Sequence, residues 1–135
     1  MYTPGGANGA NYTGSSDASP GECFTVTDTT ASTSLQDWLP NDTAIVSSAN
    51  GAPLSGTLSA QLFMGSGCAA GSDVSNQLYS KTLTGTGSSA TLTTSNTSFK
   101  VNTSTATSWL VTFNSSDPNV ASSSHCESTS LTITN

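Results

Sequence analysis

The sequence predicts an all-β protein built as a two-sheet sandwich of about seven strands. Three observations support this fold class. Short runs alternate between apolar and polar residues, which places the apolar side chains on one face of a strand. Gly, Pro, Asn, Asp and Ser bound these runs, and they favour turns. Residues that favour helices are scarce, because the 135-residue chain contains two lysines, two glutamates and no arginine. A closed barrel is the alternative arrangement for the same pattern.

Seven strands are predicted in chain order. They cover residues 23–30, 43–48, 57–64, 77–84, 89–94, 108–113 and 128–134. The segment 34–42 breaks the alternation, and we expect it to be a connection whose Trp38 covers one end of the sandwich.

The alternation also predicts which side chains form the core. In 57–64 the even positions should face inward, so Met64 is predicted inside and Phe63 outside. In 43–48 and 77–84 either face could be the inward one. The core is predicted to contain Leu58, Leu62, Leu92, Trp109, Val111, Phe113 and Leu131.

Two parts of the chain differ in composition. Residues 1–22 are rich in Gly, Asn and Ser and have no apolar periodicity, which is typical of a linker or an extended arm. Residues 23–135 carry all the strand patterns and are predicted to form one domain. The arm cannot form a core, because Met1, Tyr2 and Tyr12 are its only large apolar side chains. We expect it to connect domains or to lie on a sheet edge of a neighbouring copy.

Composition and charge disfavour several classes of protein. Only 7% of the residues are charged and the net charge is −6, whereas binding to nucleic acids or anionic membranes needs a basic surface. No run of apolar residues is long enough to predict a membrane-spanning helix. Serine and threonine supply 49 of the 135 residues, which together with the β pattern is typical of a secreted or cell-surface protein. The single histidine, His125, leaves few ways to activate a nucleophile, so we expect no enzymatic activity and no cofactor.

Three cysteines bear on the covalent structure. Their spacing contains no C-x2-C pair and matches no zinc pattern. Cys68 lies in a loop-like segment and Cys126 lies just before the last predicted strand, so we expect these two to form a disulfide, as is common outside the cell. Closing this loop of about 59 residues would stabilise the fold by about 4 kcal/mol. Cys23 is then left over, either as a buried or unpaired thiol or as a bond to another chain.

Five segments together resemble a known family. They are DTAIV (42–46), GTLSAQLF (56–63), the loop with Cys68, SWLVTFNSSDPN (108–119) and HCES (125–128). In this order they are similar to the immunoglobulin-like repeats of large secreted bacterial surface proteins, notably of actinobacteria, over about residues 23–135. The chain departs from that pattern at Ala60, where a larger residue is common, at the turn NSSDPN, and in the long segment 36–40. The resemblance implies an immunoglobulin-like sandwich, paired loop cysteines and a structural or adhesive role, and it supplies no catalytic residues.

Four residues are candidates for contact with a ligand or partner: Phe63, Tyr79, Asp117 and Asn119. Phe63 and Tyr79 could belong to a surface that stacks on a sugar ring, with the outward Phe63 as the better candidate, although a subunit contact is the alternative. Asp117 and Asn119, with Asp73, could supply oxygen ligands to calcium. The chain has no D-x-D-x-D spacing, however, and Asp and Asn cap turns routinely. No metal site is therefore predicted.

Three other features have an ordinary alternative explanation. Lys81 or Lys100 could form an isopeptide bond with an asparagine if an apolar pocket kept the amine neutral, but a solvated lysine is commoner. His125 and Glu127 flank a cysteine and are expected to be solvated. Five N-x-S/T sequons are close to the number expected by chance in so Ser/Thr-rich a chain: Asn11, Asn41, Asn96, Asn102 and Asn114.

The sequence thus predicts a non-catalytic extracellular module with a structural or adhesive role, as a repeat or subunit of a surface stalk, fibre or filament. Its expected partners are neighbouring copies or tandem domains of the same protein, and surface glycans are a second class. The alternative function is a sandwich module that binds carbohydrate or another surface ligand. Coplanar exposed aromatic side chains on one sheet face would favour that alternative.

Overall fold

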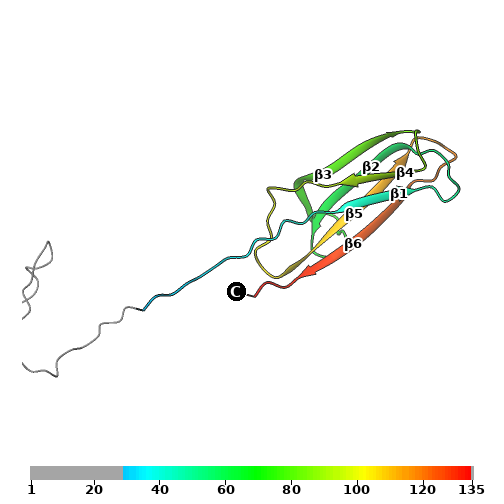
Figure 1. The fold of residues 1–135 in the computed structure, drawn as a ribbon. Coiled ribbons are helices and arrows are strands. Elements are labelled where there is room, and N and C mark those ends of the chain that lie inside the picture. The colour runs from blue at the N-terminus through cyan, green and yellow to red at the C-terminus, as the bar shows by residue number, and fades with distance from the viewer. Residues whose placement is uncertain (1–28, 135) are drawn as a thin grey trace, which may run out of the picture. The chain divides into compact units, whose positions relative to one another are not determined.

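The computed structural model describes residues 29–134, and within them it contains six strands and no helix (Figure 1). The strands are β1 (Thr43–Ser47), β2 (Ser55–Met64), β3 (Asp73–Thr84), β4 (Ser89–Thr93), β5 (Thr105–Ser115) and β6 (Ser123–Leu131). All six strands belong to one compact unit, Ser34–Asn135. The arm predicted at 1–22 and most of the strand predicted at 23–30 lie outside the described residues.

The six strands form two antiparallel sheets. One sheet pairs β1 with β4, and the other has the strand order β3-β2-β5-β6. The two sheets pack against each other through their apolar faces, and Figure 1 shows the β1–β4 pair lying over the larger sheet. The predicted two-sheet β-sandwich is therefore confirmed.

Alternation along the strands produces the core. Leu58, Ala60 and Leu62 of β2 are fully buried, and Trp109 and Phe113 of β5 are only 5% and 2% exposed. These positions share one face of the larger sheet, because cross-strand partners point to the same side. The core is completed by Ala44, Val46, Leu54, Val74, Tyr79, Leu83, Ala90, Leu92, Phe99, Val111 and Val120.

The packing determines the inward face of the two ambiguous strands. In β1 the small Ala44 is buried and Ile45 is 65% exposed. In β3 Leu83 is buried and Leu78 is 62% exposed. The even positions of β1 and the odd positions of β3 therefore face the other sheet.

Two side chains at the end of β2 differ from the prediction. Phe63 is only 8% exposed, whereas Met64 is 39% exposed. Phe63 does point to the outer face, where it stands opposite Ser108 of β5. The loop after β2 folds back across that part of the face, since the backbone N–H of Cys68 donates to Ser108 Oγ. Alternation alone could not reveal that a loop covers the outer face here.

The last strand begins earlier than predicted. It was expected at 128–134, but β6 spans Ser123–Leu131, so Cys126 lies inside the strand and not before it. The segment SSHCESTSL has no apolar alternation, and its pairing with β5 sets its limits. Leu131, predicted in the core, is half-buried at the end of β6 and belongs to neither cluster of core residues.

The connection predicted at 34–42 contains no strand. It is fixed to the sandwich by two reciprocal backbone hydrogen bonds of 2.8 Å between Trp38 and Val101. Trp38 is half-buried and Val101 is 4% exposed.

Candidate functional site

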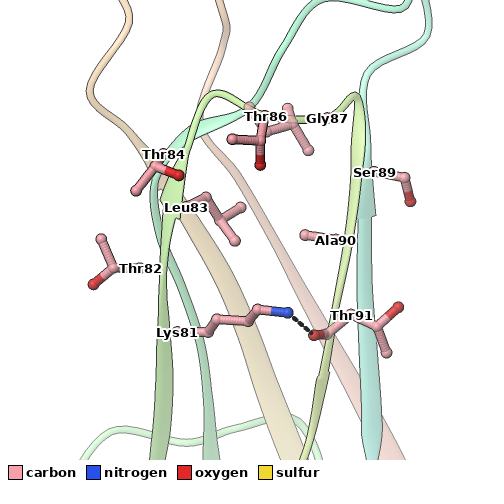
Figure 2. Close-up of a pocket in the computed structure, with 10 residues that line it drawn as sticks. Lys81, Thr82, Leu83, Thr84, Thr86, Gly87, Ser89, Ala90 and Thr91 are labelled. Carbon is pink, nitrogen blue, oxygen red and sulfur yellow. Dashed lines mark hydrogen bonds between the residues drawn. The ribbon is translucent and has the colours of Figure 1, made fainter.

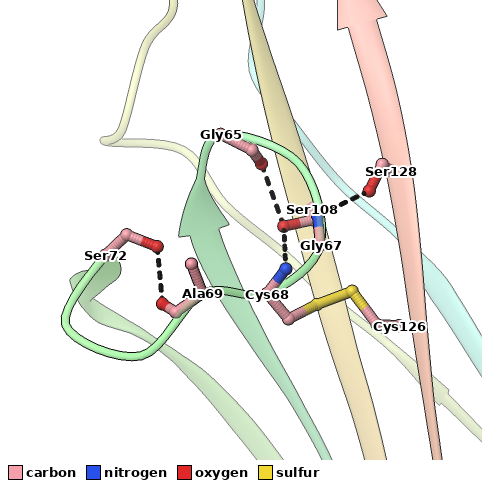
Figure 3. The surroundings of a disulfide bond; sticks show 8 residues. All are labelled: Gly65, Gly67, Cys68, Ala69, Ser72, Ser108, Cys126 and Ser128. Carbon is pink, nitrogen blue, oxygen red and sulfur yellow. Dashed lines mark hydrogen bonds between the residues drawn. A yellow bond between two sulfur atoms is a disulfide. The ribbon is translucent and has the colours of Figure 1, made fainter.

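The disulfide predicted between Cys68 and Cys126 is present. Cys68 lies in the loop 65–72 that connects β2 to β3, and Cys126 lies in β6 opposite Leu110. Their Cα atoms are 6.1 Å apart, which is usual for a disulfide. β5 lies between β2 and β6 in the sheet. The disulfide therefore joins the loop after β2 to β6, a strand that does not pair with β2 (Figure 3).

Hydrogen bonds hold the same loop on the sheet. Ser108 is 1% exposed, and its Oγ donates to the Gly65 carbonyl and accepts from the Cys68 N–H, both at 3.0 Å. Ser128 Oγ accepts from the Gly67 N–H at 3.0 Å. Cys68 has a φ of 50°, a conformation that non-glycine residues keep only when the surroundings hold them. Sequence reasoning missed both serines, since serine is too common in this chain to be a signal.

A network of asparagines fastens the segment before β1 to the turn after β4. Asn96 is 3% exposed and uses its whole side-chain amide. Its Nδ2 donates to the carbonyls of Pro40 and Phe99 at 3.1 and 2.8 Å. Its Oδ1 accepts from the N–H groups of Ser98 and Phe99 at 3.1 and 2.8 Å. Asn41 Oδ1 in turn accepts from the backbone N–H of Asn96.

These bonds distinguish the four sequons that lie within the described residues. The amides of Asn96 and Asn41 are both engaged, and Asn96 is buried. Asn102 and Asn114 are exposed. A glycan on either of these two would break no side-chain hydrogen bond within the described part of the chain. Asn11 lies outside that part.

Two carboxyl groups from distant parts of the sequence influence each other. Asp42 precedes β1, and Glu127 lies in β6 opposite Trp109, so it faces the other sheet. A hydrogen bond with the Asp42 side chain is the largest cause that raises the pKa of Glu127. Partial burial and the negative charge of Asp42 act in the same direction, whereas His125 lowers this pKa.

The state of this pair follows from the chemistry of carboxyl groups. Asp42 Oδ2 is buried and has no hydrogen-bond donor among residues 29–134. Two ionised carboxylates cannot bond to each other, so Glu127 bonds to Asp42 only while the pair holds a proton. Glu127 is exposed, as predicted, but its contact with Asp42 was not foreseen because the two residues are far apart in the sequence.

Neither aromatic candidate for sugar stacking is exposed. Phe63 lies on the outer face but is buried under the loop after β2, and the prediction that it is exposed is wrong. Tyr79 is half-buried, its ring centre lies 6.0 Å from that of Trp109, and its hydroxyl donates to Gln77 Oε1 at 2.8 Å. The large apolar side chains that the described residues do expose are not aromatic: Leu35, Leu39, Ile45, Met64 and Leu78.

The two polar candidates cap a turn. Asp117 Oδ1 accepts from the backbone N–H and from Nδ2 of Asn119, at 2.8 and 3.2 Å. Asp73 is not near them, because it pairs with Phe63 at one end of β2 while Ser116 pairs with Ser55 at the other. The calcium ligands considered above are therefore not brought together.

Both lysines are exposed and lack the apolar pocket that an isopeptide bond requires. Lys100 Nζ lies 2.7 Å from Asp37 Oδ2. Lys81 Nζ donates to the carbonyl of Thr91 at 3.0 Å, across a groove of about 520 Å³ between β3 and β4 (Figure 2). Hydroxyl side chains line much of this groove, and Leu83 and Ala90 form part of its floor.

The chain enters and leaves the sandwich at the same end. Residues 36–38 line one hollow together with residues 131–133. Ser104 Oγ donates to the carbonyl of Ile133 and accepts from its N–H. The opposite end consists of the three loops 48–54, 85–88 and 116–122. We call these the far loops, and they include Asp117 and Asn119.

Residues 29–134 contain no group of three His, Cys, Asp or Glu side chains arranged to hold a metal ion. They also contain no helix that could span a membrane. No protein-family model, curated protein or solved structure matches the chain.

Proposed function

We propose that this chain is a non-catalytic structural or adhesive module that acts outside the cell, as a repeat or subunit of a surface stalk, fibre or filament. The observation that carries the proposal is the common end at which the chain enters and leaves the sandwich. If the domain is attached through this end, its far loops are the part most distant from the point of attachment. That geometry suits a unit displayed on a surface.

The outward face of the larger sheet supports a role in contact between copies. Its middle consists of cross-strand rows of hydroxyl and amide side chains without a charged residue: Ser80, Ser59, Thr112 and Ser124 in one row, and Thr82, Thr57 and Asn114 in the next. The chain as a whole carries a net charge of −6. An uncharged face lets copies of like charge approach without repulsion.

The disulfide supports the extracellular part of the proposal. Such bonds persist in oxidising surroundings and are rare where thiols are kept reduced. The bond between Cys68 and Cys126 also fixes a loop next to the attached end of the domain. A covalent tie at that position suits a protein that must hold its shape outside the cell.

Immunogold electron microscopy of cells that produce the protein would test this function. Antibodies against the far loop 116–122 should label fibres or the outer surface at regular intervals. Label confined to the cell interior would contradict the proposal. The carbohydrate-binding alternative receives no support from the described aromatic residues, and a glycan array would test it independently.

A further inference from the structure

The sheet that pairs β1 with β4 has two outer edges. Backbone groups alternate along a strand between the partner strand and the outer edge, so the hydrogen bonds between β1 and β4 show which groups lie on each edge. Ser48 N–H donates to the Ser88 carbonyl. Thr94 N–H donates to the Asp42 carbonyl. In an antiparallel pair both backbone groups of such residues face the partner strand. The even positions of β1 therefore face β4, and the groups directed away from β4 belong to Thr43, Ile45 and Ser47.

A lysine covers the outer edge of β4, one of these two edges. Thr91 is the partner of Ile45 across the sheet, so its carbonyl points to the outer edge of β4. Lys81 Nζ reaches over from β3 and donates to that carbonyl at 3.0 Å (Figure 2). Lysines at sheet edges are a common protection against the addition of a further strand.

The β1 edge has no comparable guard among residues 29–134. Its central side chain, Ile45, is apolar and 65% exposed. This edge lies on the side of the larger sheet that ends in β6, since Lys81 of β3 reaches β4, β1 is on the far side of β4, and β6 is at the opposite end of the sheet from β3. Every position of β6 except Cys126 and Leu131 is exposed, so the β1–β4 pair leaves this strand uncovered. We call the side between β1 and β6 the open side.

We propose that the open side accepts an extended strand, residues 23–28, from a second copy of this chain. The inference rests on the proposed function and names the site at which copies meet. In CFTVTD, Phe24 and Val26 alternate with threonines, so a strand made of them has an apolar and a polar face, as is typical of a strand that adds to a sheet edge. Its six residues are enough to pair along the five residues of β1.

The segment between residues 23–28 and the sandwich is long enough to reach a second copy. Residues 29–37 are exposed at every position, and nine extended residues span about 30 Å. One such strand binds weakly on its own, because ordering it costs conformational entropy, and repetition along an assembly offsets this cost.

The test uses full-length protein with Cys23→Ser, so that no intermolecular disulfide contributes. Ile45→Pro removes a donor from the open edge and leaves the bonds to β4 intact. Thr91→Pro is the matched control, because it makes the same change at the guarded edge and keeps the carbonyl that Lys81 binds. A third variant, Phe24→Asp with Val26→Pro, disables the arm. Ile45→Lys is a second edge variant that preserves the backbone if the proline impairs folding.

Sedimentation velocity should show concentration-dependent association of the Cys23→Ser protein. The edge and arm variants should each associate at least about tenfold more weakly, and Thr91→Pro should match the parent. Mixing the arm variant with Ile45→Pro should give a heterodimer and nothing larger, since one supplies only the edge and the other only the arm.

Two results would overturn the inference alone. In one, the parent associates and both Ile45 variants associate equally well, so that copies meet elsewhere. In the other, hydrogen exchange shows the amides of Thr43, Ile45 and Ser47 protected in the monomer, so that each arm occupies its own edge. If the parent remains monomeric at every concentration, the inference fails together with contact between copies as part of the proposed function.

Discussion

Replacing Asn96 with alanine should destabilise the domain by about 3 kcal/mol. The side chain makes four hydrogen bonds, to the carbonyls of Pro40 and Phe99 and to the N–H groups of Ser98 and Phe99. A hydrogen bond contributes about 1 kcal/mol net, and a buried group left unpaired costs about 1–3 kcal/mol. Pro40 is fully buried, so its carbonyl has little access to water after the change. The backbone groups of the exposed Ser98 can bind water, which keeps the total below the simple sum.

Urea unfolding under oxidising conditions measures this effect. Asn102→Ala is the matched control, because that asparagine is exposed, and its loss should change stability by less than about 0.5 kcal/mol. Asn96→Asp tests the cause. It keeps the size of the side chain but replaces the Nδ2 donor with an oxygen that faces two carbonyls. It should therefore destabilise the domain as much as alanine does at pH 7.

A cost below about 1 kcal/mol for Asn96→Ala would refute the argument. It would mean that water satisfies the groups that Asn96 binds, and that the segment before β1 is held by other contacts. An Asn96→Asp protein as stable as the wild type would show that the carbonyl contacts of Nδ2 contribute nothing.

Three further predictions concern the core, the carboxyl pair and the disulfide. Trp109→Ala should cost about 3–5 kcal/mol in urea unfolding through the cavity it leaves, and a cost below about 1 kcal/mol would contradict its place in the core. The raised pKa of Glu127 gives stability that is complete below its ordinary value of 4.5 and is lost as the pH rises through the folded-state pKa. Glu127→Gln donates to Asp42 at every pH, so its stability relative to the wild type should rise between pH 4 and pH 7, and a constant difference would argue against the pair. In single-molecule pulling, the oxidised domain should release about 210 Å less chain than the reduced one, because 58 positions separate the cysteines at about 3.6 Å each; equal lengths would contradict the bond.

The parts of the fold that the sequence predicts are those governed by local alternation. Leu58, Leu62, Trp109 and Phe113 were placed in the core from period-two patterns alone, and each is buried. In each of these strands the buried face is apolar along most of its length, so local and global preferences agree. The disulfide was predictable because the pattern places Cys68 in a loop and Cys126 just before the last predicted strand, and the pairing is present although Cys126 lies inside that strand.

The features that escaped prediction depend on contacts between distant segments. Phe63 is hidden by a loop whose path depends on the disulfide and on Ser108. Asn96 appeared only as one of several sequons, and nothing local shows that its amide lies between Pro40 and Phe99. In β6 the polar sequence has no period at all, so its pairing with β5 sets its limits.

The same distant contacts predict how the end of the domain formed by residues 36–38 and 131–133 would respond to a pulling force. A pull on the chain acts at residues 36–38 and 131–133, which lie side by side, so it would peel β6 from β5 one pair at a time. Peeling of this kind breaks hydrogen bonds singly and needs little force. The disulfide at Cys126 stops it after residues 127–131, because from there β6 is held covalently to the loop 65–72. At residues 36–38, where the force would also act, the hydrogen bonds between Trp38 and Val101 must break before the force reaches β1. The far loops lie at the opposite end from the disulfide and the Trp38–Val101 hydrogen bonds. They are held by short turn contacts such as that of Asp117 with Asn119. They are therefore expected to open more easily than the end formed by residues 36–38 and 131–133.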